Sequence, residues 1–423
     1  MEPAENNKSI RDEIIANLEN PRQLEKLYRE NKGIYKKEFK MLYPSIRDHP
    51  AATFWNERLN FEQDDISWGT RREWTFIIVA AIISGLIAKI AQFASIDEDY
   101  YYSRNIAFIV FPMLTLYFAW RQQLPANKLF PVLIAMVISA VYINLLPDNP
   151  KSDTLILACI HLPLFMWALL GFTYTGGTMT LYSKRVDFLR FNGDLVVMGG
   201  VIAIAMMGLS VITIGLFKLL DLDIGEFYFK NIAIWGFSAL PLIATYLVLT
   251  NPQLVNKVSP IIARVFTPLV LITLVVYLIA IIYTGKDPYN DREFLMIFNM
   301  LLVGVMAIIF FSIAELSKNS ANKTGVILLF LLSIVTVLVN GYALSAILYR
   351  IFTMGVTPNR LAVSGANVLM LINLVLVTYQ LYKTISNQGD IEEVEKSIAK
   401  FLPVYVLWSI LVTFIFPVLF SFK

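Results

Sequence analysis

Lys89 is the charged residue that lies deepest inside an apolar run of this sequence, the run 75–95. Ala81 and Gly85 precede it at steps of four and form a small-residue ridge where another helix can pack closely. A charge is costly in apolar surroundings, so Lys89 should face protein. It could contact an ion or substrate beside a carboxylate, or it could reach Asp97 or Glu98 at the end of its run.

His161 is the second candidate, because it stands directly before Leu162 and Pro163 in another apolar run. Pro163 cannot donate a hydrogen bond to the carbonyl of Cys159, so a helix should bend there. An imidazole beside an unpaired carbonyl could relay a proton or sense pH. The alternative is a structural histidine that is hydrogen-bonded within a helix bundle.

A polar stripe is the third candidate. Ser333, Thr336 and Asn340 recur at steps of three and four, so they share one face of a helix. Three asparagines lie in neighbouring apolar runs: Asn299, Asn367 and Asn373. These side chains could line a polar cavity, or they could join helices by hydrogen bonds worth on the order of 1 kcal/mol each. The candidate ligand or ion pathway comprises Lys89, His161, Asn299, Ser333, Thr336 and Asn340.

Charged residues also gather just before one apolar run. Asp194 follows Asn192 and Gly193 at the head of this run, where a carboxylate can cap a helix and suits its dipole. Arg185 and Arg190 are close enough in sequence to pair with it. We therefore expect an interfacial group of Arg185, Arg190 and Asp194, and we assign no catalytic residue to it.

Metal and cofactor chemistry have little support in the sequence. One cysteine and two histidines are too few for a cysteine or histidine metal site within one chain. Asp287, Asp291 and Glu293 could hold a cation, but their spacing is not that of an EF-hand, and Asp287-Pro288 is a good turn signal. We expect no metal and no cofactor. A net charge of +3 also argues against a nucleic-acid partner.

The elements that must position these residues are long apolar runs. The chain has 423 residues, of which 57% are hydrophobic and only 16% are charged. In soluble domains about a quarter of the residues are charged. A helix needs about 20 apolar residues to cross the hydrocarbon of a bilayer. We count roughly eleven such runs, at about 75–95, 105–120, 129–146, 154–175, 195–220, 230–250, 263–284, 294–315, 324–349, 361–382 and 401–421. The sequence therefore predicts an all-α fold, a polytopic transmembrane helical bundle of about 11 spans.

The first part of the chain has a different composition. Residues 1–72 are rich in charge and carry apolar residues at helical spacing, so we expect a small helical cytosolic domain there. Residues 73–423 then form the transmembrane helical domain. The first domain could be a solvated cap, or it could dock a cytosolic or membrane protein partner. Two joints, 179–191 and 384–400, read as short helices lying at the membrane interface.

The distribution of lysine and arginine predicts the orientation. The polar segments that connect the apolar runs alternate between the two sides of the membrane. Those on the same side as the N-terminus are basic, and those on the opposite side are richer in acidic residues. Basic joints stay in the cytoplasm, so the N-terminus should be cytoplasmic. No signal peptide opens the chain, because its first residues are polar and charged.

Several segments resemble a known family. They are NPRQLEKLYRENKGIYKKEF (20–39), FWNERL (54–59), FNGDLVV (191–197), SPIIARVFTPLVLITLVVYLIA (259–280) and GKDPYNDREFLMIFN (285–299). This pattern is similar to a family of bacterial multi-pass membrane proteins, that of domain of unknown function forty-one fifty-three. The resemblance implies a polytopic helical fold in the bacterial inner membrane, and it supplies no activity and no catalytic residues.

Three functions are open on these grounds. The leading expectation is a non-enzymatic integral membrane protein of transport or sensing type, surrounded by membrane lipids. The second is a membrane enzyme acting on a lipid or polyprenyl substrate, although such enzymes usually carry a carboxylate or histidine cluster with a metal. The third is a membrane scaffold for partner proteins.

Overall fold

The computed structural model describes residues 3–30, 32–61, 69–178, 180–284, 289, 292–318 and 323–422. The acidic joint considered for a cation, with Asp287 and Asp291, lies outside these residues. The chain divides into two compact units, Met1–Trp68 and Gly69–Lys423. All regular structure in the described residues is helical, as the sequence predicts.

The first unit is a four-helix domain with its own core. Its helices are α1 (Pro3–Ala16), α2 (Pro21–Glu30), α3 (Lys32–Ile46) and α4 (Pro50–Phe61). Three aromatic rings form the centre, with centroids 5.2–5.6 Å apart: Tyr28, Tyr35 and Trp55. Arg58 lies 4.7 Å above the Trp55 ring and is 2.8 Å from the carboxylate of Glu25. The buried aromatic rings, together with Arg58 packed over Trp55, give this short segment a core of its own.

The second unit holds all the long apolar helices. They are α5 (Arg71–Ala88), α6 (Ile90–Phe93), α7 (Glu98–Arg121), α8 (Ala126–Leu145), α9 (Asp153–Tyr174), α10 (Tyr182–Lys218), α11 (Gly225–Tyr228), the π-helix η1 (Phe229–Ala233), α12 (Ile234–Thr250), α13 (Pro252–Thr284), α14 (Arg292–Lys318), α15 (Lys323–Met354), α16 (Pro358–Ile385), α17 (Ile391–Ile410), the π-helix η2 (Leu411–Ile415) and α18 (Phe416–Leu419).

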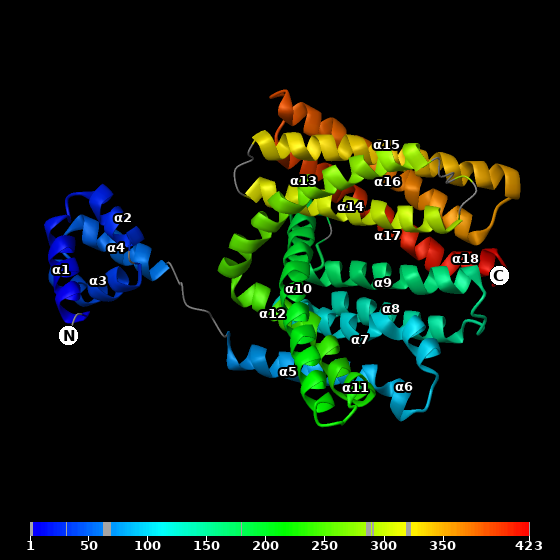
Figure 1. Ribbon diagram of the computed structural model, residues 1–423, viewed down its shortest axis with the longest axis horizontal. Coiled ribbons are helices and arrows are strands. Elements are labelled where there is room, and N and C mark those ends of the chain that lie inside the picture. Colours follow the sequence, from blue (N-terminus) through cyan, green and yellow to red (C-terminus); the bar gives the residue numbers. More distant parts are fainter. Residues whose placement is uncertain are drawn as a thin grey trace. The chain divides into compact units, whose positions relative to one another are not determined.

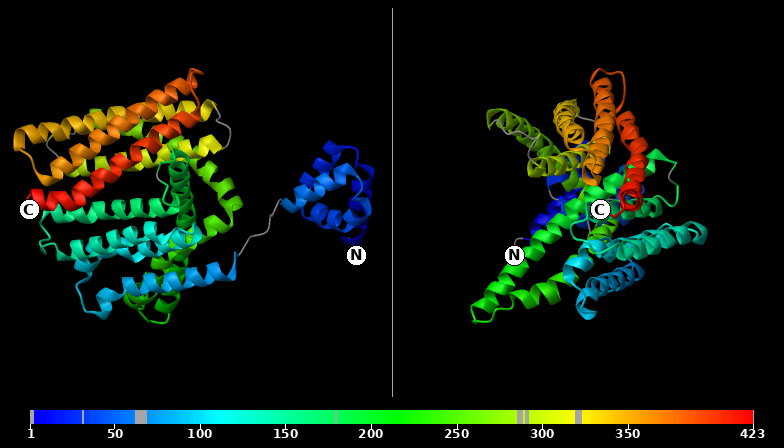
Figure 2. Two further views of the ribbon diagram at one scale, coloured as in Figure 1. Left: turned by 180° about the vertical axis from the view of Figure 1, so that it is seen from behind. Right: turned by 90° about the vertical axis from the view of Figure 1, so that its right-hand side faces the viewer.

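Two groups of helices and one crossing helix make up this unit. Figure 1 and Figure 2 show α13–α17, coloured yellow-green to red, lying together, and α5–α9, coloured blue to green, lying together beside them. The long helix α10 crosses both groups at a steep angle. It contacts α9 in the group α5–α9 and α13, α14 and α17 in the other group, and it also packs against α12. The apolar core is divided in the same way, because one cluster is built from α13–α17 and two others from α5–α10 and α12.

The expected number of about eleven spans is wrong. Nine helical segments in the described residues are long and apolar enough to cross a membrane. The other two expected spans correspond to α5 and α7. Three of the 18 residues of α5 are charged, because it opens with Arg71, Arg72 and Glu73. α7 begins with a polar stretch that contains Glu98 and Asp99. These charges leave each helix with a shorter apolar stretch, which accounts for the difference.

Helix starts also differ from the expectation at α10. Asp194 does not cap this helix, because α10 already begins at Tyr182, with Leu181 in the N-cap position. The interfacial segment expected at 179–191 is therefore the first part of one continuous helix of 37 residues. The segment expected at 384–400 likewise continues, as α17, into the last apolar span. Backbone hydrogen bonding carries both helices past the point where the side chains change from polar to apolar.

Much of the outer surface is apolar. Large side chains exposed on α10 include Val196, Ile204, Leu209, Val211 and Leu216, and those on α13 include Ile261, Val265, Leu269, Ile272 and Ile279. A soluble protein rarely exposes such continuous apolar faces. These faces suit contact with the hydrocarbon of a bilayer, and the polar side chains of the spans then face the interior of the protein.

Candidate functional site

The polar stripe of α15 points into the protein. Ser333, Thr336 and Asn340 are all fully buried. Two of them return their hydroxyl hydrogens to their own helix, Ser333 to the carbonyl of Phe330 and Thr336 to that of Leu332. Asn340 is different, since neither its Oδ1 nor its Nδ2 has a hydrogen-bond partner among the described residues.

A second asparagine pair joins α14 to α16. Asn299 Nδ2 donates to the carbonyl of Leu295 at 2.7 Å, and Asn367 Nδ2 donates to Asn299 Oδ1 at 2.8 Å. A carbonyl can only accept, so the orientation of Asn299 is fixed and Asn367 must present its NH₂ group to it. The buried Oδ1 of Asn367 is consequently left without a described partner.

The same pattern recurs between α16 and α17. Asn373 Nδ2 donates to the hydroxyl of Tyr405 at 3.0 Å, and that hydroxyl donates to Met306 Sδ at 3.6 Å. Asn373 is fully buried, and its Oδ1 has no partner in the described part of the chain. Asn299, Asn340, Asn367 and Asn373 are called the asparagine cluster below.

The asparagine cluster is spread over three neighbouring helices of one packed group, α14, α15 and α16. Asn340 and Asn373 lie at the same level, because each is about 21–23 Å along its helix from the α15–α16 turn at 1.5 Å per residue. Val339 and Leu374, their neighbours in sequence, belong to the same buried apolar cluster. The four asparagines together have three acceptors and one donor that lack partners in the described residues: Asn340 Oδ1, Asn367 Oδ1, Asn373 Oδ1 and Asn340 Nδ2.

Buried polar groups of this kind need a hydrogen-bonding partner. A buried polar group without a partner costs about 1–3 kcal/mol, and native proteins usually satisfy it with water, an ion or a ligand. Hydrocarbon outside the bundle cannot supply one. An excess of acceptors favours a species that donates hydrogen bonds or carries positive charge.

Lys89 lies elsewhere, at the break between α5 and α6. Its Nζ donates to the side chain of Gln92, to the carbonyl of Lys230 at 2.8 Å and to Asn231 Oδ1 at 3.0 Å. Three donors meet three neutral oxygens, so the ammonium is fully hydrogen-bonded. These contacts tie the end of α5 to the π-helix η1.

His161 lies in α9, within the other group of helices. Its Nδ1 is 2.9 Å from the carbonyl of Leu157, one turn earlier in the helix. The imidazole ring is therefore hydrogen-bonded to a backbone carbonyl of its own helix. Lys89 and His161 belong to α5–α6 and α9, whereas Asn299, Ser333, Thr336 and Asn340 belong to α14 and α15, so the predicted pathway residues fall in two places.

The interfacial arginines are part of a charged network at one end of α10. Arg190 donates to Glu395 of α17 at 2.8 Å, to Asp187 at 2.9 Å and to the carbonyl of Ala314 at 2.8 Å. The Glu395 partner lies 205 residues away in sequence, and nothing in the sequence pattern identified it. This network fastens α10 to α14 and α17 at the same time.

The other two interfacial residues make similar contacts. Arg185 donates to the carbonyl of Ala399 at 2.8 Å. Asp194 accepts a hydrogen bond of 2.6 Å from the hydroxyl of Ser259 on α13. The three predicted residues thus lie along one stretch of α10, and their described contacts reach α13, α14 and α17.

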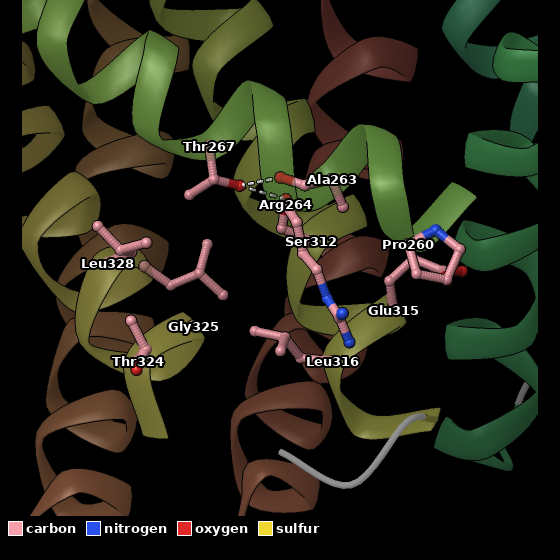
Figure 3. Close-up of a pocket in the computed structure, with 11 residues that line it drawn as sticks. Pro260, Ala263, Arg264, Thr267, Ser312, Glu315, Leu316, Thr324, Gly325 and Leu328 are labelled. Carbon is pink, nitrogen blue, oxygen red and sulfur yellow. Dashed lines mark hydrogen bonds between the residues drawn. The ribbon is translucent and has the colours of Figure 1, made fainter. Parts of the chain in front are cut away.

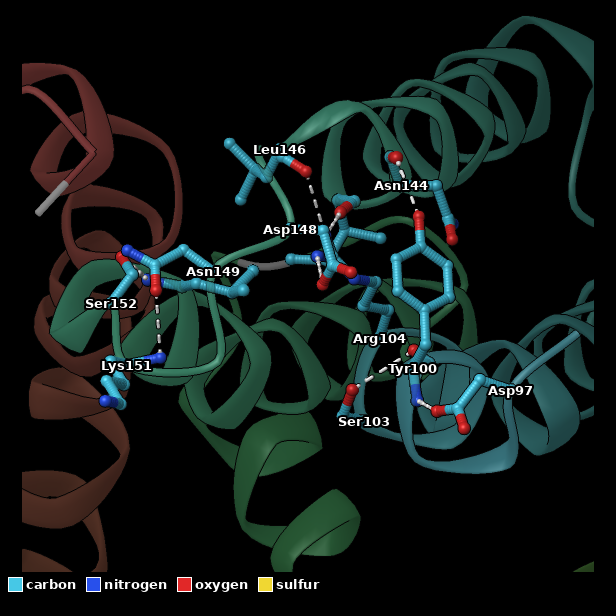
Figure 4. A network of polar contacts seen from close by, with 12 residues as sticks. Asp97, Tyr100, Ser103, Arg104, Asn144, Leu146, Asp148, Asn149, Lys151 and Ser152 are labelled. Carbon is cyan, nitrogen blue, oxygen red and sulfur yellow. Dashed lines mark hydrogen bonds and ion pairs between the residues drawn. The ribbon is translucent and has the colours of Figure 1, made fainter.

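Arg104, which no sequence pattern identified, anchors α7 to the end of α8 (Figure 4). Its side chain is only 2% exposed and donates to the carbonyls of Ile143 at 2.7 Å and Leu146 at 3.2 Å. It also lies 3.3 Å from Asp148 and 4.4 Å from the centre of the Tyr100 ring. Carbonyls at a helix end have no partner within the helix, so Arg104 acts as a cap.

A pair of asparagines beside Arg104 shows what full satisfaction looks like. Asn105 Nδ2 donates to Asn144 Oδ1 at 3.0 Å, and Asn144 Nδ2 donates back to Asn105 Oδ1 at 2.8 Å. Their remaining hydrogens go to backbone carbonyls of their own helices. This structural pair contrasts with the asparagine cluster.

The described surface of the second unit includes a groove and a cavity. One is an open groove of about 790 Å³ between α5 and α7, with Arg71, Arg72 and Trp120 at its edge. The other is a cavity of about 210 Å³ where α13, α14 and α15 meet, lined in part by Arg264, Ser312 and Glu315 (Figure 3). No group of three or more histidine, cysteine, aspartate or glutamate side chains that could hold a metal occurs in the residues described.

Comparison of the chain with models of protein families, with curated proteins and with solved structures finds no match. The assignment of a function therefore depends on the geometry alone.

Proposed function

We propose that this chain is a multi-pass protein of the bacterial inner membrane, with its N-terminus in the cytoplasm, and that it works in transport or sensing. The asparagine cluster binds the transported or sensed species. The observation that supports this proposal is the set of buried amide groups without described partners in α15 and α16. The Asn105–Asn144 pair, in which each amide bonds to the other, is the contrasting structural arrangement.

The chemistry of the cluster limits what it binds. Three of the four groups that lack partners are amide oxygens, which are hard, neutral ligands. None of the four residues is a carboxylate, and divalent cation sites in proteins normally include carboxylates. The occupant is therefore a monovalent cation or a small solute that donates hydrogen bonds.

The first unit adds a second part to the proposal. It has its own aromatic core, and it contains many charged side chains. We assign it to docking of a cytosolic or membrane protein partner. The bias of lysine and arginine along the sequence supports its cytoplasmic side.

Thermal unfolding of the purified full chain in detergent tests the proposal. Unfolding is followed in sodium, potassium, ammonium and choline chloride at equal ionic strength. Ligand that binds only the folded state raises the midpoint by mass action. We expect at least one of the small cations to raise the midpoint above that in choline chloride, and Asn340→Leu and Asn373→Leu to abolish the difference.

Asn105→Leu is the matched control, because it also removes a buried asparagine from a long helix. It should lower the midpoint in every salt and keep the cation effect. Equal midpoints for the unmodified protein in all four salts, at concentrations up to molar, would remove the case for a cation. Flux of the stabilising cation in proteoliposomes then separates transport from sensing.

A further inference from the structure

The cavity between α13, α14 and α15 has the size and the depth of a lipid headgroup site. Its volume is about 210 Å³, whereas a single water needs only about 10–15 Å³ by a comparable measure. The apolar spans that border it run Val258–Ile281 on α13 and Leu295–Leu316 on α14. The cavity lies at the beginning of the first and the end of the second, which is where headgroups lie.

One wall of the cavity favours a phosphate. The Arg264 side chain extends into it between Glu315 and Leu316 (Figure 3). The first turn of α15, with Thr324 and Gly325, forms another part of the wall. Amide groups at a helix start have no partner within the helix and lie at the positive end of its dipole.

Gly325 allows this backbone to come close. A Cβ atom at that position would lie 2.9 Å from a methyl carbon of Leu316, so a larger residue would push the first turn of α15 away from α14. An arginine and a helix start that face one cavity make a site for a phosphate.

The opposite charge is present in the same cavity. Glu315 lines it and is only 3% exposed. Ser312 and Thr267, whose hydroxyls lie 2.9 Å apart, form the polar floor beside it. A carboxylate next to a phosphate-binding wall suits a ligand that carries an ammonium group as well as a phosphate.

The outward side of α13 is apolar at the level of the cavity and beyond it. Ile261, Val265, Leu269 and Ile272 are exposed there. These side chains suit hydrocarbon, in which the acyl chain of a lipid bound in the cavity can lie.

We propose that this cavity binds the headgroup of an aminophospholipid, with the phosphate at Arg264 and the start of α15 and the ammonium at Glu315. The site is separate from the asparagine cluster, and the proposal goes beyond the transport or sensing function. A primary ammonium can donate hydrogen bonds to Glu315, a trimethylated one cannot, and a glycerol headgroup carries no positive charge. The cavity therefore discriminates between lipids that share the same phosphate.

Native mass spectrometry of the full chain, purified in detergent and stripped of lipid, tests the proposal. The protein is titrated with phosphatidylethanolamine, phosphatidylcholine and phosphatidylglycerol of matched acyl chains. We expect phosphatidylethanolamine to bind at least about tenfold more tightly than the other two, as one charge-assisted hydrogen bond provides. Arg264→Gln should weaken all three lipids by about tenfold, and Glu315→Gln should remove the preference among them.

The control is Lys218→Gln, which removes an exposed cation at the far end of α10 and should leave all three affinities unchanged. Equal binding of the three lipids by the unmodified protein would overturn the proposal, as would a preference that survives Glu315→Gln. Soluble phosphoethanolamine at millimolar concentration should displace little lipid, and full displacement would overturn the lipid assignment in favour of a water-soluble ligand. Arg264 is exposed, so its variant keeps the test open even where Glu315→Gln does not fold.

Discussion

Replacing Asn340 with leucine should stabilise the protein when no small cation is present. Leucine has the same branching at Cγ as asparagine, and it places two methyl groups where Oδ1 and Nδ2 now lie. Both of these polar atoms are buried without a described partner. Removing a buried polar group that has no partner recovers its desolvation cost, whereas most core substitutions destabilise.

The expected gain is about 1–5 kcal/mol. Each unsatisfied buried group costs about 1–3 kcal/mol, and Asn340 has two. The bulkier methyl groups oppose this gain by about 1 kcal/mol or more of overpacking, since the side chain is fully enclosed. The net effect should therefore remain positive and measurable.

Equilibrium unfolding of the detergent-solubilised chain in choline chloride measures this gain. Asn105→Leu, studied alongside, should lose about 0.6–1.7 kcal/mol, from the mean to the maximum found for hydrogen bonds between membrane helices. The reasoning is refuted if Asn340→Leu is destabilised as much as Asn105→Leu, because Asn340 would then have a partner like that of Asn105.

The other predictions concern features that hold the fold together. Arg104→Leu should cost about 1.5–3 kcal/mol, because two carbonyls at the end of α8 lose a charged donor, and chemical unfolding of the full chain measures the loss. Gly365→Ala should destabilise by about 1–3 kcal/mol, since a Cβ there would lie 2.1 Å from the Trp408 ring, whereas Gly208→Ala, with open space around it, should stabilise by about 0.5–1 kcal/mol; equal midpoints of the two variants would contradict this packing. A fragment of residues 1–68 should fold on its own, and its circular dichroism should show a cooperative transition. In that fragment, hydrogen bonds from Arg29 and then Arg58 hold the pKa of Glu25 below its ordinary value of 4.5. Stability from Glu25 is therefore complete above pH 4.5 and lost as the pH falls through the lowered pKa, and Glu25→Gln should flatten that part of the profile.

Periodicity predicted which side chains would be buried, and it did so best where a helix has one polar face. Ser333, Thr336 and Asn340 stand at helical spacing, and all three are enclosed. Their partners could not be predicted in the same way. The Asn299–Asn367 contact joins residues 68 positions apart, and it depends on which helices are neighbours, information that no local pattern holds.

Hydropathy misplaced helix starts for a physical reason. It marks where side chains enter hydrocarbon, whereas a helix ends only where its backbone hydrogen bonds end. α10 therefore begins twelve residues before Asp194, and Asp194 meets Ser259 from inside the helix. The number of spans was overestimated for a related reason. The apolar parts of α5 and α7 were counted as spans, although the charged first turns of both helices shorten their apolar stretches.

The uninterrupted course of α10 has a mechanical consequence. Its 37 residues make a rod of about 55 Å, well beyond the roughly 30 Å of hydrocarbon, so it has to lean or project. Arg190 and its neighbours clamp one end, while Gly200, Gly208 and Gly215 near the other have open space on their Cβ side. Further along the rod, Ser210 donates to the hydroxyl of Tyr228 at 3.2 Å, and α10 packs against α12. A shift of α10 that follows the loss of the Arg190–Glu395 contact would therefore be passed on to α12, which is not one of the helices joined by that ion pair.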